Sequence, residues 1–142
     1  MGSESTVDGF NAAADRRLPG LLGFRATAAS PGRVGAERDV RDDLLAPNGD
    51  LHAAVVGALA ATACGLGART VLPDGATCFT TIELKSNFLG TALDGTVRTV
   101  ATAVHAGRTT QGWDATVTHV GSERTLAPFR CTQAVLWPLR PP

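Results

Sequence analysis

The chain has 142 residues, with 13 lysines and arginines balanced by 13 aspartates and glutamates, and it contains three cysteines. This length is typical of one domain with a sizeable core. The balanced charge, with no local cluster of basic residues, argues against nucleic-acid binding. The cysteines are far apart and form no C-x-x-C pair, so we predict neither a disulfide framework nor a metal site. We expect no cofactor. Unpaired cysteines favour a cytoplasmic location.

The first part of the chain predicts a short tail followed by one helix. Apolar residues recur at helical spacing between Val7 and Arg17, and Pro19-Gly20 is expected to end that helix. We therefore divide the chain into residues 1–18, a tail with a short helix, and residues 19–142, a single domain. Within that domain, residues 21–29 and 33–40 predict two strands joined as a hairpin.

Residues 51–68 contain no formally charged side chain and lie between Asp50 and Arg69. The segment is rich in alanine and glycine, so it is weakly hydrophobic for a membrane span, which needs about 20 strongly apolar residues. We expect a buried helix that ends near Gly65 and Gly67, with Arg69 at the negative end of its dipole. No membrane association is predicted.

A twofold period replaces the helical one after the turn at Pro73-Asp74-Gly75. It predicts four consecutive antiparallel strands over residues 77–89, 96–105, 109–120 and 126–137. In the first of them, Phe79 and Thr81 are expected on one side, with Ile82 and Leu84 on the other. The predicted fold is α+β, an antiparallel sheet of about six strands wrapped around one long helix, with edges open to pairing in an oligomer.

Four motifs follow one another along residues 20–137 of this layout. They are Asn48-Gly49-Asp50-Leu51-His52, Leu59-Ala60-Ala61, the strand from Thr81 to Leu89, and His105-Ala106-Gly107-Arg108-Thr109-Thr110. In this order they resemble the hotdog-fold acyl-CoA thioesterases of the phenylacetate-degradation and 4-hydroxybenzoyl-CoA type. That family has an Asn/Gln-containing loop, His-Gly-Gly at the start of the central helix, a carboxylate within the helix, a T-x-E-L-x-x-N-F-L strand and an H-x-G-x-T-T joint.

The resemblance implies a homodimer, or a homotetramer formed as a dimer of dimers, that hydrolyses an acyl-CoA or other acyl thioester between subunits. The thioester carbonyl is expected at the backbone N–H groups that begin the central helix, where negative charge is stabilised. His-Gly-Gly has become His52-Ala53-Ala54, and the carboxylate position has become Ala61. The predicted catalytic positions are Asn48, Asp50, His52, Ala53 and Ala61.

Ala61 supplies no acid, base or nucleophile, so three alternatives stay open. The chain is an inactivated variant, a natural enzyme that uses another group, or a protein that binds acyl thioesters without hydrolysis; a hotdog enzyme of other chemistry, such as a dehydratase, is a further alternative. The candidate substitutes are Asp50, His52, Thr62 and Cys64. Structural roles compete for each: N-cap or loop support for Asp50, an orienting role for His52, and core packing for the last two.

The predicted substrate-binding positions are Ala54, Thr62, Thr80, Arg108, Thr109 and Thr110. Thr80 corresponds to a polar strand position that faces the site in similar enzymes. Arg108 and the two threonines after it occupy the joint that contacts the nucleotide part of coenzyme A in the family. An arginine with two hydroxyls suits a phosphate, although a plain hairpin turn explains the same residues.

Overall fold

The computed structural model describes residues 6–141, so residues 1–5 of the predicted tail lie outside the described part of the chain. The elements in chain order are α1 (Val7–Ala14), α2 (Leu18–Leu21), β1 (Arg25–Ser30), β2 (Arg33–Asp39), the 3₁₀ turn η2 (Asp42–Leu44), α3 (Ala53–Thr70), β3 (Cys78–Ser86), β4 (Thr96–Ala106), β5 (Thr110–His119) and β6 (Arg124–Leu136).

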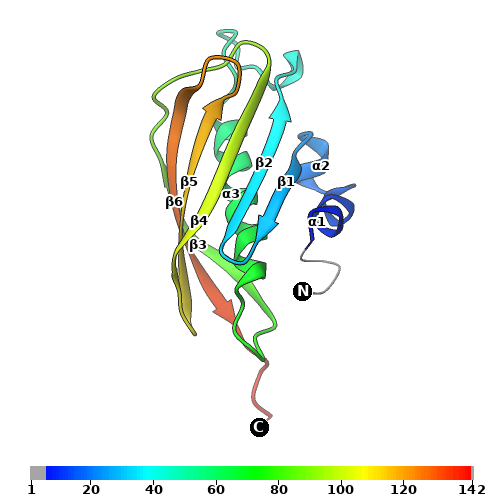
Figure 1. Ribbon diagram of the computed structural model, residues 1–142, viewed down its shortest axis with the longest axis vertical. Helices are drawn as coiled ribbons and strands as arrows, with labels where there is room; N and C mark the ends of the chain where they lie inside the picture. Colours follow the sequence, from blue (N-terminus) through cyan, green and yellow to red (C-terminus); the bar gives the residue numbers. More distant parts are fainter. Residues whose placement is uncertain (1–5, 142) are drawn as a thin grey trace.

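Six antiparallel strands form one sheet, in the order β1-β2-β4-β5-β6-β3, and α3 lies along one face of it (Figure 1). This confirms the predicted α+β fold with six strands and one long helix. The four consecutive antiparallel strands predicted after the turn at Pro73 are present as β3 to β6, and β3 pairs with β6 while β4 pairs with β2 and β5. The linker between β3 and β4 returns the chain from the sheet edge to its middle. One long edge, β3, is thereby left open.

The central helix does not end at its glycines, as the sequence suggested, but continues to Thr70. A Cβ atom on Gly67 would lie 2.5 Å from the ring of Trp113, and one on Gly65 would lie 3.3 Å from the ring of Phe79. Both glycines therefore allow an aromatic ring to pack directly on the helix backbone. Close approach, and not termination, explains why these positions carry no side chain.

Buried polar groups complete the C-terminal end of α3. The side-chain amide of Gln111 on β5 donates to the backbone oxygens of Ala68 and Val71, both at 3.4 Å. Its oxygen accepts from Nε1 of Trp113 at 2.9 Å. Because the last carbonyls of a helix have no partner within the helix, the glutamine supplies what the helix cannot. Arg69 lies in the last turn, as predicted.

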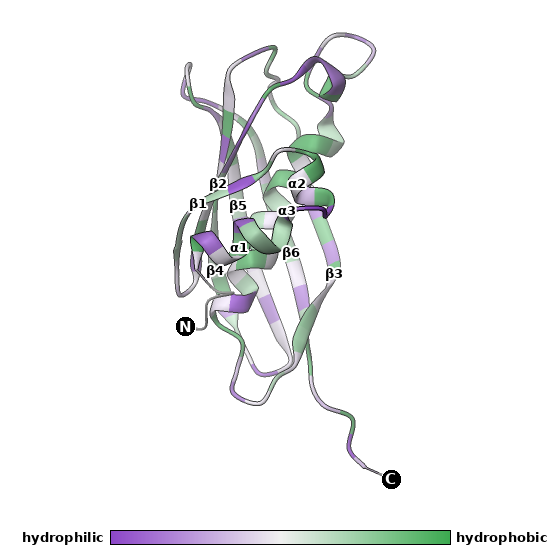
Figure 2. Cartoon of the chain, turned by 90° about the vertical axis from the view of Figure 1, so that its right-hand side faces the viewer, coloured by the Kyte–Doolittle hydropathy of each residue, from purple (hydrophilic) through white to green (hydrophobic). Residues whose placement is uncertain are grey.

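Helix α3 is long and apolar enough, by length and composition alone, to cross a membrane. In this structure it is the core helix, and Figure 2 shows its apolar character over most of its length. Its sheet-facing side is buried. The opposite flank, which includes Gly57, Ala61 and Gly65, is only half-buried, so one chain encloses the helix on one side only.

The N-terminal helices pack beside α3, along β1. Phe10 of α1 is buried in the common core, and the side-chain amide of Asn11 exchanges hydrogen bonds of 3.1 and 2.7 Å with the backbone of Ala26. The first helix ends before Pro19, as predicted, but it already ends at Ala14, and Pro19 stands in the first turn of a second helix, α2. Proline suits that position, since the first turn of a helix needs no N–H acceptor.

A bulge in β3 between Thr81 and Glu83 changes which side chains face the helix. Thr81 hydrogen-bonds the buried side chain of Gln133 at 2.7 Å, which places it on the helix side together with Phe79, as predicted. Beyond the bulge, Leu84 lies opposite the buried Cys131 and is therefore on the helix side again. The predicted separation of Leu84 from Thr81 is wrong for this reason.

Candidate active site

An open hollow with a volume of about 490 Å³ surrounds the N-terminal end of α3. Three segments form it: the loop before α3, the first turn of α3, and the linker that follows β3, with one residue from β6. The lining residues are Ala46, Asn48, Asp50, Leu51, His52, Ala53, Val56, Phe88, Leu89, Gly90, Thr91 and Arg124. The structure thus brings together four of the five predicted catalytic positions, Asn48, Asp50, His52 and Ala53.

His52 is the N-cap of α3. Its backbone is extended (φ −61°, ψ 131°), and its Nδ1 atom accepts a hydrogen bond of 3.0 Å from the N–H of Ala54. A ring nitrogen that accepts must be unprotonated, so the neutral imidazole carries its proton on Nε2. His52, which lines the hollow, can therefore donate from Nε2, and it cannot serve as a general base through Nδ1 without giving up the cap.

The first N–H of the helix, on Ala53, has no acceptor among residues 6–141. The next three are engaged: Ala54 donates to the imidazole of His52, while Val55 and Val56 donate to its backbone oxygen at 2.9 and 3.3 Å. The unpaired N–H stands at the positive end of an 18-residue helix dipole. Two donors, this N–H and Nε2–H of His52, are thus available to an oxygen that carries negative charge.

Asp50 does not cap the helix, so that alternative for it is wrong. Its N–H donates to Oδ1 of Asn48 at 3.1 Å, and Nδ2 of Asn48 donates back to its carboxylate at 3.3 Å. The pair holds the turn before α3, which is the loop support that the sequence also suggested. Among the residues that line the hollow, Asp50 carries the one carboxylate.

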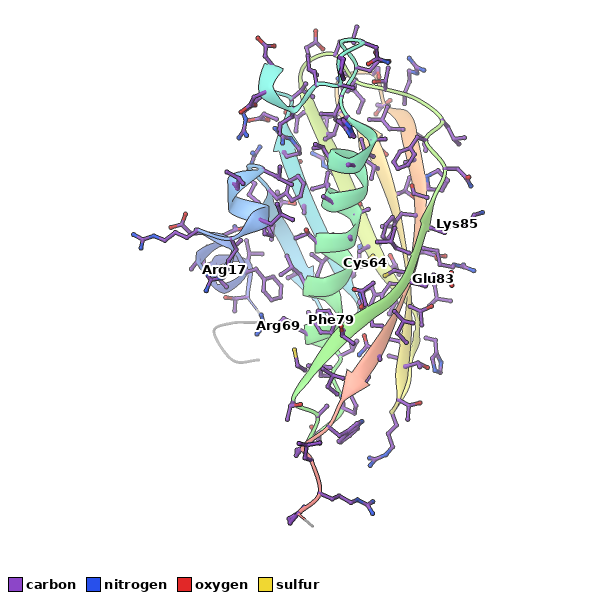
Figure 3. The ribbon with its side chains drawn as sticks, turned by 180° about the vertical axis from the view of Figure 1, so that it is seen from behind. Arg17, Cys64, Arg69, Phe79, Glu83 and Lys85 are labelled. Atoms are coloured by element: carbon purple, nitrogen blue, oxygen red, sulfur yellow. The ribbon has the colours of Figure 1, made fainter. Side chains whose placement is uncertain are left out.

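Ala61 lies about two turns along α3 from Ala53 and does not line the hollow. The other helix candidates are also elsewhere. Thr62 lines a separate cavity between α1, β1 and α3. Cys64 is buried between helix and sheet (Figure 3), where a hydrogen bond with Cys131 and desolvation raise the pKa of its thiol. A thiol that resists ionisation is a poor nucleophile, so Cys64 does not replace the carboxylate.

The structure places Thr80 on the face of the sheet that points away from α3. Its neighbour Thr81 faces the helix side, and side chains alternate along a strand, so Thr80 lies on the opposite face of the sheet. Figure 3 shows Glu83 and Lys85 of β3 pointing away from α3 as well.

The joint of Arg108, Thr109 and Thr110 lies at the far end of the molecule from the hollow. The guanidinium of Arg108 stacks on the ring of Trp137 at 4.1 Å, and Nε1 of Trp137 donates to the backbone oxygen of Arg108 at 3.1 Å. The neighbouring Gln111 caps the C-terminal end of α3. The joint is thus roughly 27 Å from the hollow along the helix axis. One chain does not bring these two predicted sites together.

Sequence reasoning missed the wall of the hollow opposite the helix. Phe88 and Leu89 supply an apolar surface there, and Arg124 at the start of β6 supplies a cation. Arg124 falls between the strands predicted over residues 109–120 and 126–137, and no local signal indicated its position across from α3. Among residues 6–141, no three His, Cys, Asp or Glu side chains gather closely enough to hold a metal ion.

Comparison with known proteins agrees with this architecture. The family model of the thioesterase superfamily matches residues 48–125. The 1,4-dihydroxy-2-naphthoyl-CoA hydrolase of Listeria monocytogenes is 30% identical over 119 residues, which cover 83% of this chain and 94% of that protein.

Solved structures of thioesterases share this fold. Thioesterase HI1161 of Haemophilus influenzae has a TM-score of 0.87 at 24% identity, over 95% of this chain and 93% of that one. A mutant of thioesterase PA1618 of Pseudomonas aeruginosa has a TM-score of 0.86 at 27% identity, over 92% and 93% of the two chains. The sheet and the single long helix define a hotdog fold, and the family model and the Listeria relative place it among the hydrolases of thioester bonds. The chain belongs to the thioesterase superfamily.

Proposed function

We propose that the chain hydrolyses an acyl-CoA whose thioester carbonyl is bound at the N-terminal end of α3. The observation that carries this proposal is the unpaired N–H of Ala53. With Nε2–H of His52, it offers two donors to the oxygen that becomes negatively charged in the transition state. A helix N-terminus is preorganised for this task, because its N–H groups and dipole are already oriented.

Asp50 is the group that we propose to activate water. Its carboxylate takes a proton from a water molecule, and the resulting hydroxide adds to the carbonyl carbon. The tetrahedral oxyanion, held by Ala53 and His52, then collapses with cleavage of the C–S bond. The thiolate leaves and takes up the proton, so that the products are a carboxylic acid and free coenzyme A. The partnership of Asp50 with Asn48 keeps this carboxylate in the hollow.

We further propose that two copies pair through their β3 edges. This edge has no neighbouring strand in the described chain, and Ile82 and Leu84 on it are 62% and 54% exposed. An exposed apolar edge strand is a template for pairing. Antiparallel pairing about a two-fold axis inverts the partner, so the partner's joint at Arg108 would lie level with the N-terminal end of α3. The half-buried flank of α3 would then be covered.

An aromatic acyl group is our first choice of substrate. The Listeria relative is named for a naphthoyl thioester, and Phe88 offers an aromatic ring in the wall of this hollow. Stacked or edge-on contacts between rings add to the apolar area that such a group would bury.

A second function, acyl-thioester binding without hydrolysis, is favoured by Ala61. A Staphylococcus aureus protein, SAV0944, was crystallised with a glutamate replaced by alanine, and its fold still matches this chain with a TM-score of 0.80. Loss of a glutamate is thus compatible with the fold of such a chain.

Turnover of aromatic, short and long acyl-CoA substrates separates the two functions. We expect hydrolysis by the wild type, and a loss of roughly a hundredfold in kcat for Asp50→Asn. Unchanged turnover in Asp50→Asn would remove Asp50 from the mechanism. If the wild type binds these substrates by calorimetry without hydrolysing them, and Ala61→Glu creates activity, the chain is a binding protein.

A further inference from the structure

The hollow contains a cation that the proposed chemistry does not use. The side chain of Arg124 lines the hollow, and its Nη2 atom would lie 3.6 Å from a Cβ atom on Gly90. It makes no ion pair or side-chain hydrogen bond with any residue between 6 and 141. Two other exposed arginines are engaged: Arg98 pairs with Glu37, and Arg130 pairs with Asp114.

Backbone hydrogen bonds fix Arg124 across the hollow from the helix. The N–H groups of Leu89 and Gly90 donate to the oxygen of Leu126 on β6 at 2.8 and 3.1 Å, and Leu51 donates to the oxygen of Ala92 at 3.0 Å. The linker after β3 therefore ties the start of β6 to the loop before α3. These backbone bonds place Arg124, whose side chain is exposed, on one wall of the hollow, and the unpaired N–H of Ala53 lies on the other.

The formal charges of Arg124 and Asp50 in the lining balance, and the α3 dipole adds partial positive charge. Arg124 and the positive end of the α3 dipole face it from two sides, whereas Asp50 is the one carboxylate in its lining and already accepts from Asn48. A guanidinium presents a planar fork of donors that matches two oxygens of an anionic group. The guanidinium and the helix dipole thus suit a substrate that brings an anionic oxygen of its own.

We propose that Arg124 determines specificity in this site by binding an anionic oxygen of the thioester substrate, an inference that rests on the carbonyl site proposed above. A carboxylate on the acyl group and a phosphate of coenzyme A share this chemistry. The acyl group is the expected source, because it is attached directly to the carbonyl, whereas the whole pantetheine arm separates the carbonyl from the nearest phosphate.

Four thioesters test the proposal. The acyl group is meta-carboxybenzoyl or its neutral isostere meta-carbamoylbenzoyl, and each is carried on coenzyme A or on N-acetylcysteamine, which has no phosphate. The variants are Arg124→Gln, the conservative Arg124→Lys, and Arg33→Gln, which removes an exposed arginine from the start of β2 as a matched control for charge.

For Arg124→Gln we expect kcat/KM of the carboxybenzoyl thioesters to fall about tenfold on both carriers, with less than a twofold change for the carbamoyl pair. Arg124→Lys should recover part of the loss, and Arg33→Gln should match the wild type. A fall on coenzyme A alone, for both acyl groups, assigns the anion to a phosphate. Equal change for all four substrates, or none, overturns the proposal.

Failure of the underlying hydrolysis is a different result. It would appear as no turnover of any of the four thioesters by the wild type. In that case the same comparison is made on the Kd of each thioester by calorimetry. A Kd that Arg124→Gln weakens for the anionic thioesters alone supports the role of Arg124, and a Kd that does not discriminate overturns it.

Discussion

The two ends of α3 are built in opposite ways. At the C-terminal end, protein groups satisfy the helix: Gln111 binds the carbonyls of Ala68 and Val71, and Trp113 packs on Gly67 with no space left. At the N-terminal end, His52 caps one N–H, the N–H of Ala53 has no acceptor in the described chain, and an open hollow lies in front.

This difference separates stability from function along one helix. An unpaired polar group is costly when it is buried, so a helix end that is left unpaired needs solvent or a ligand in front of it. The closed end contributes packing and buried hydrogen bonds to the fold. The open end keeps its donors for a substrate. Substitutions at the closed end should therefore change the free energy of unfolding, whereas those at the open end should mainly change turnover.

The largest effect is expected for Gly67→Ala. The new Cβ atom would lie 2.5 Å from the buried ring of Trp113, so helix and sheet must separate, at a cost of about 3 kcal/mol in the free energy of unfolding. Gly57→Ala is the matched control, since the nearest atom there is 3.9 Å away, an ordinary contact. Urea denaturation measures both. Equal stability of the two variants would show that the closed end is not tightly packed.

Gln111→Leu should cause the next largest loss in the free energy of unfolding. It leaves Nε1 of Trp113 and the carbonyl of Val71 without this partner and removes the side-chain donor to the carbonyl of Ala68, and we expect a loss of about 2 kcal/mol. Thr116→Ala, an exposed position on the same strand, should change stability by less than about 0.5 kcal/mol. If thermal and urea unfolding do not distinguish the two variants, the glutamine is not a helix cap.

At the open end, His52→Ala and His52→Asn sharpen the comparison. Alanine removes the N-cap and should cost about 1 kcal/mol, whereas the asparagine side-chain oxygen can cap the helix and restore stability. Both lose Nε2–H, so both should lose turnover. The check is a melting temperature beside a rate for each variant. An asparagine variant with full activity would show that His52 acts only as a cap.

The smallest change in stability is expected for a residue of the sheet and not of either end of α3. The buried side chain of Thr99 on β4 has an oxygen with no partner among the described residues. Thr99→Val replaces it by an apolar group of similar shape, so we expect stability to rise by about 1 kcal/mol, with turnover unchanged. A decrease in the midpoint of urea unfolding would show that this hydroxyl is satisfied in solution.

The sequence predicted the fold well because its signals are local. The uncharged segment from Leu51 to Ala68 and the later twofold period correctly indicated one core helix and the strands. The wrong predictions came from contacts distant in sequence. Gly65 and Gly67 resembled a helix end, and only Phe79 and Trp113 show why glycine stands there. The bulge at Ile82 likewise moves Leu84 to the helix side through its pairing with β6.

The site was predictable only in part for the same reason. Asn48, Asp50, His52 and Ala53 are consecutive or nearly so, and they meet in the hollow. Thr62 and Thr80 were predicted to bind substrate from their positions in the sequence. In the structure, Thr62 lines a separate cavity, and Thr80 lies on the face of the sheet away from α3. The place of Arg124 in the hollow was missed because it lies 72 residues after His52 in the sequence. Only the folded linker after β3 brings the two into one hollow.

The unpaired N–H of Ala53 is the centre of this account, and kcat of Ala53→Pro tests it most directly. Proline suits the first position of a helix, and His52 already has the extended backbone that a residue before proline requires. The variant should therefore fold with the melting temperature of the wild type while lacking one N–H. We predict a fall in kcat of at least about a hundredfold with the best acyl-CoA. A stable Ala53→Pro variant that turns over like the wild type would contradict the account.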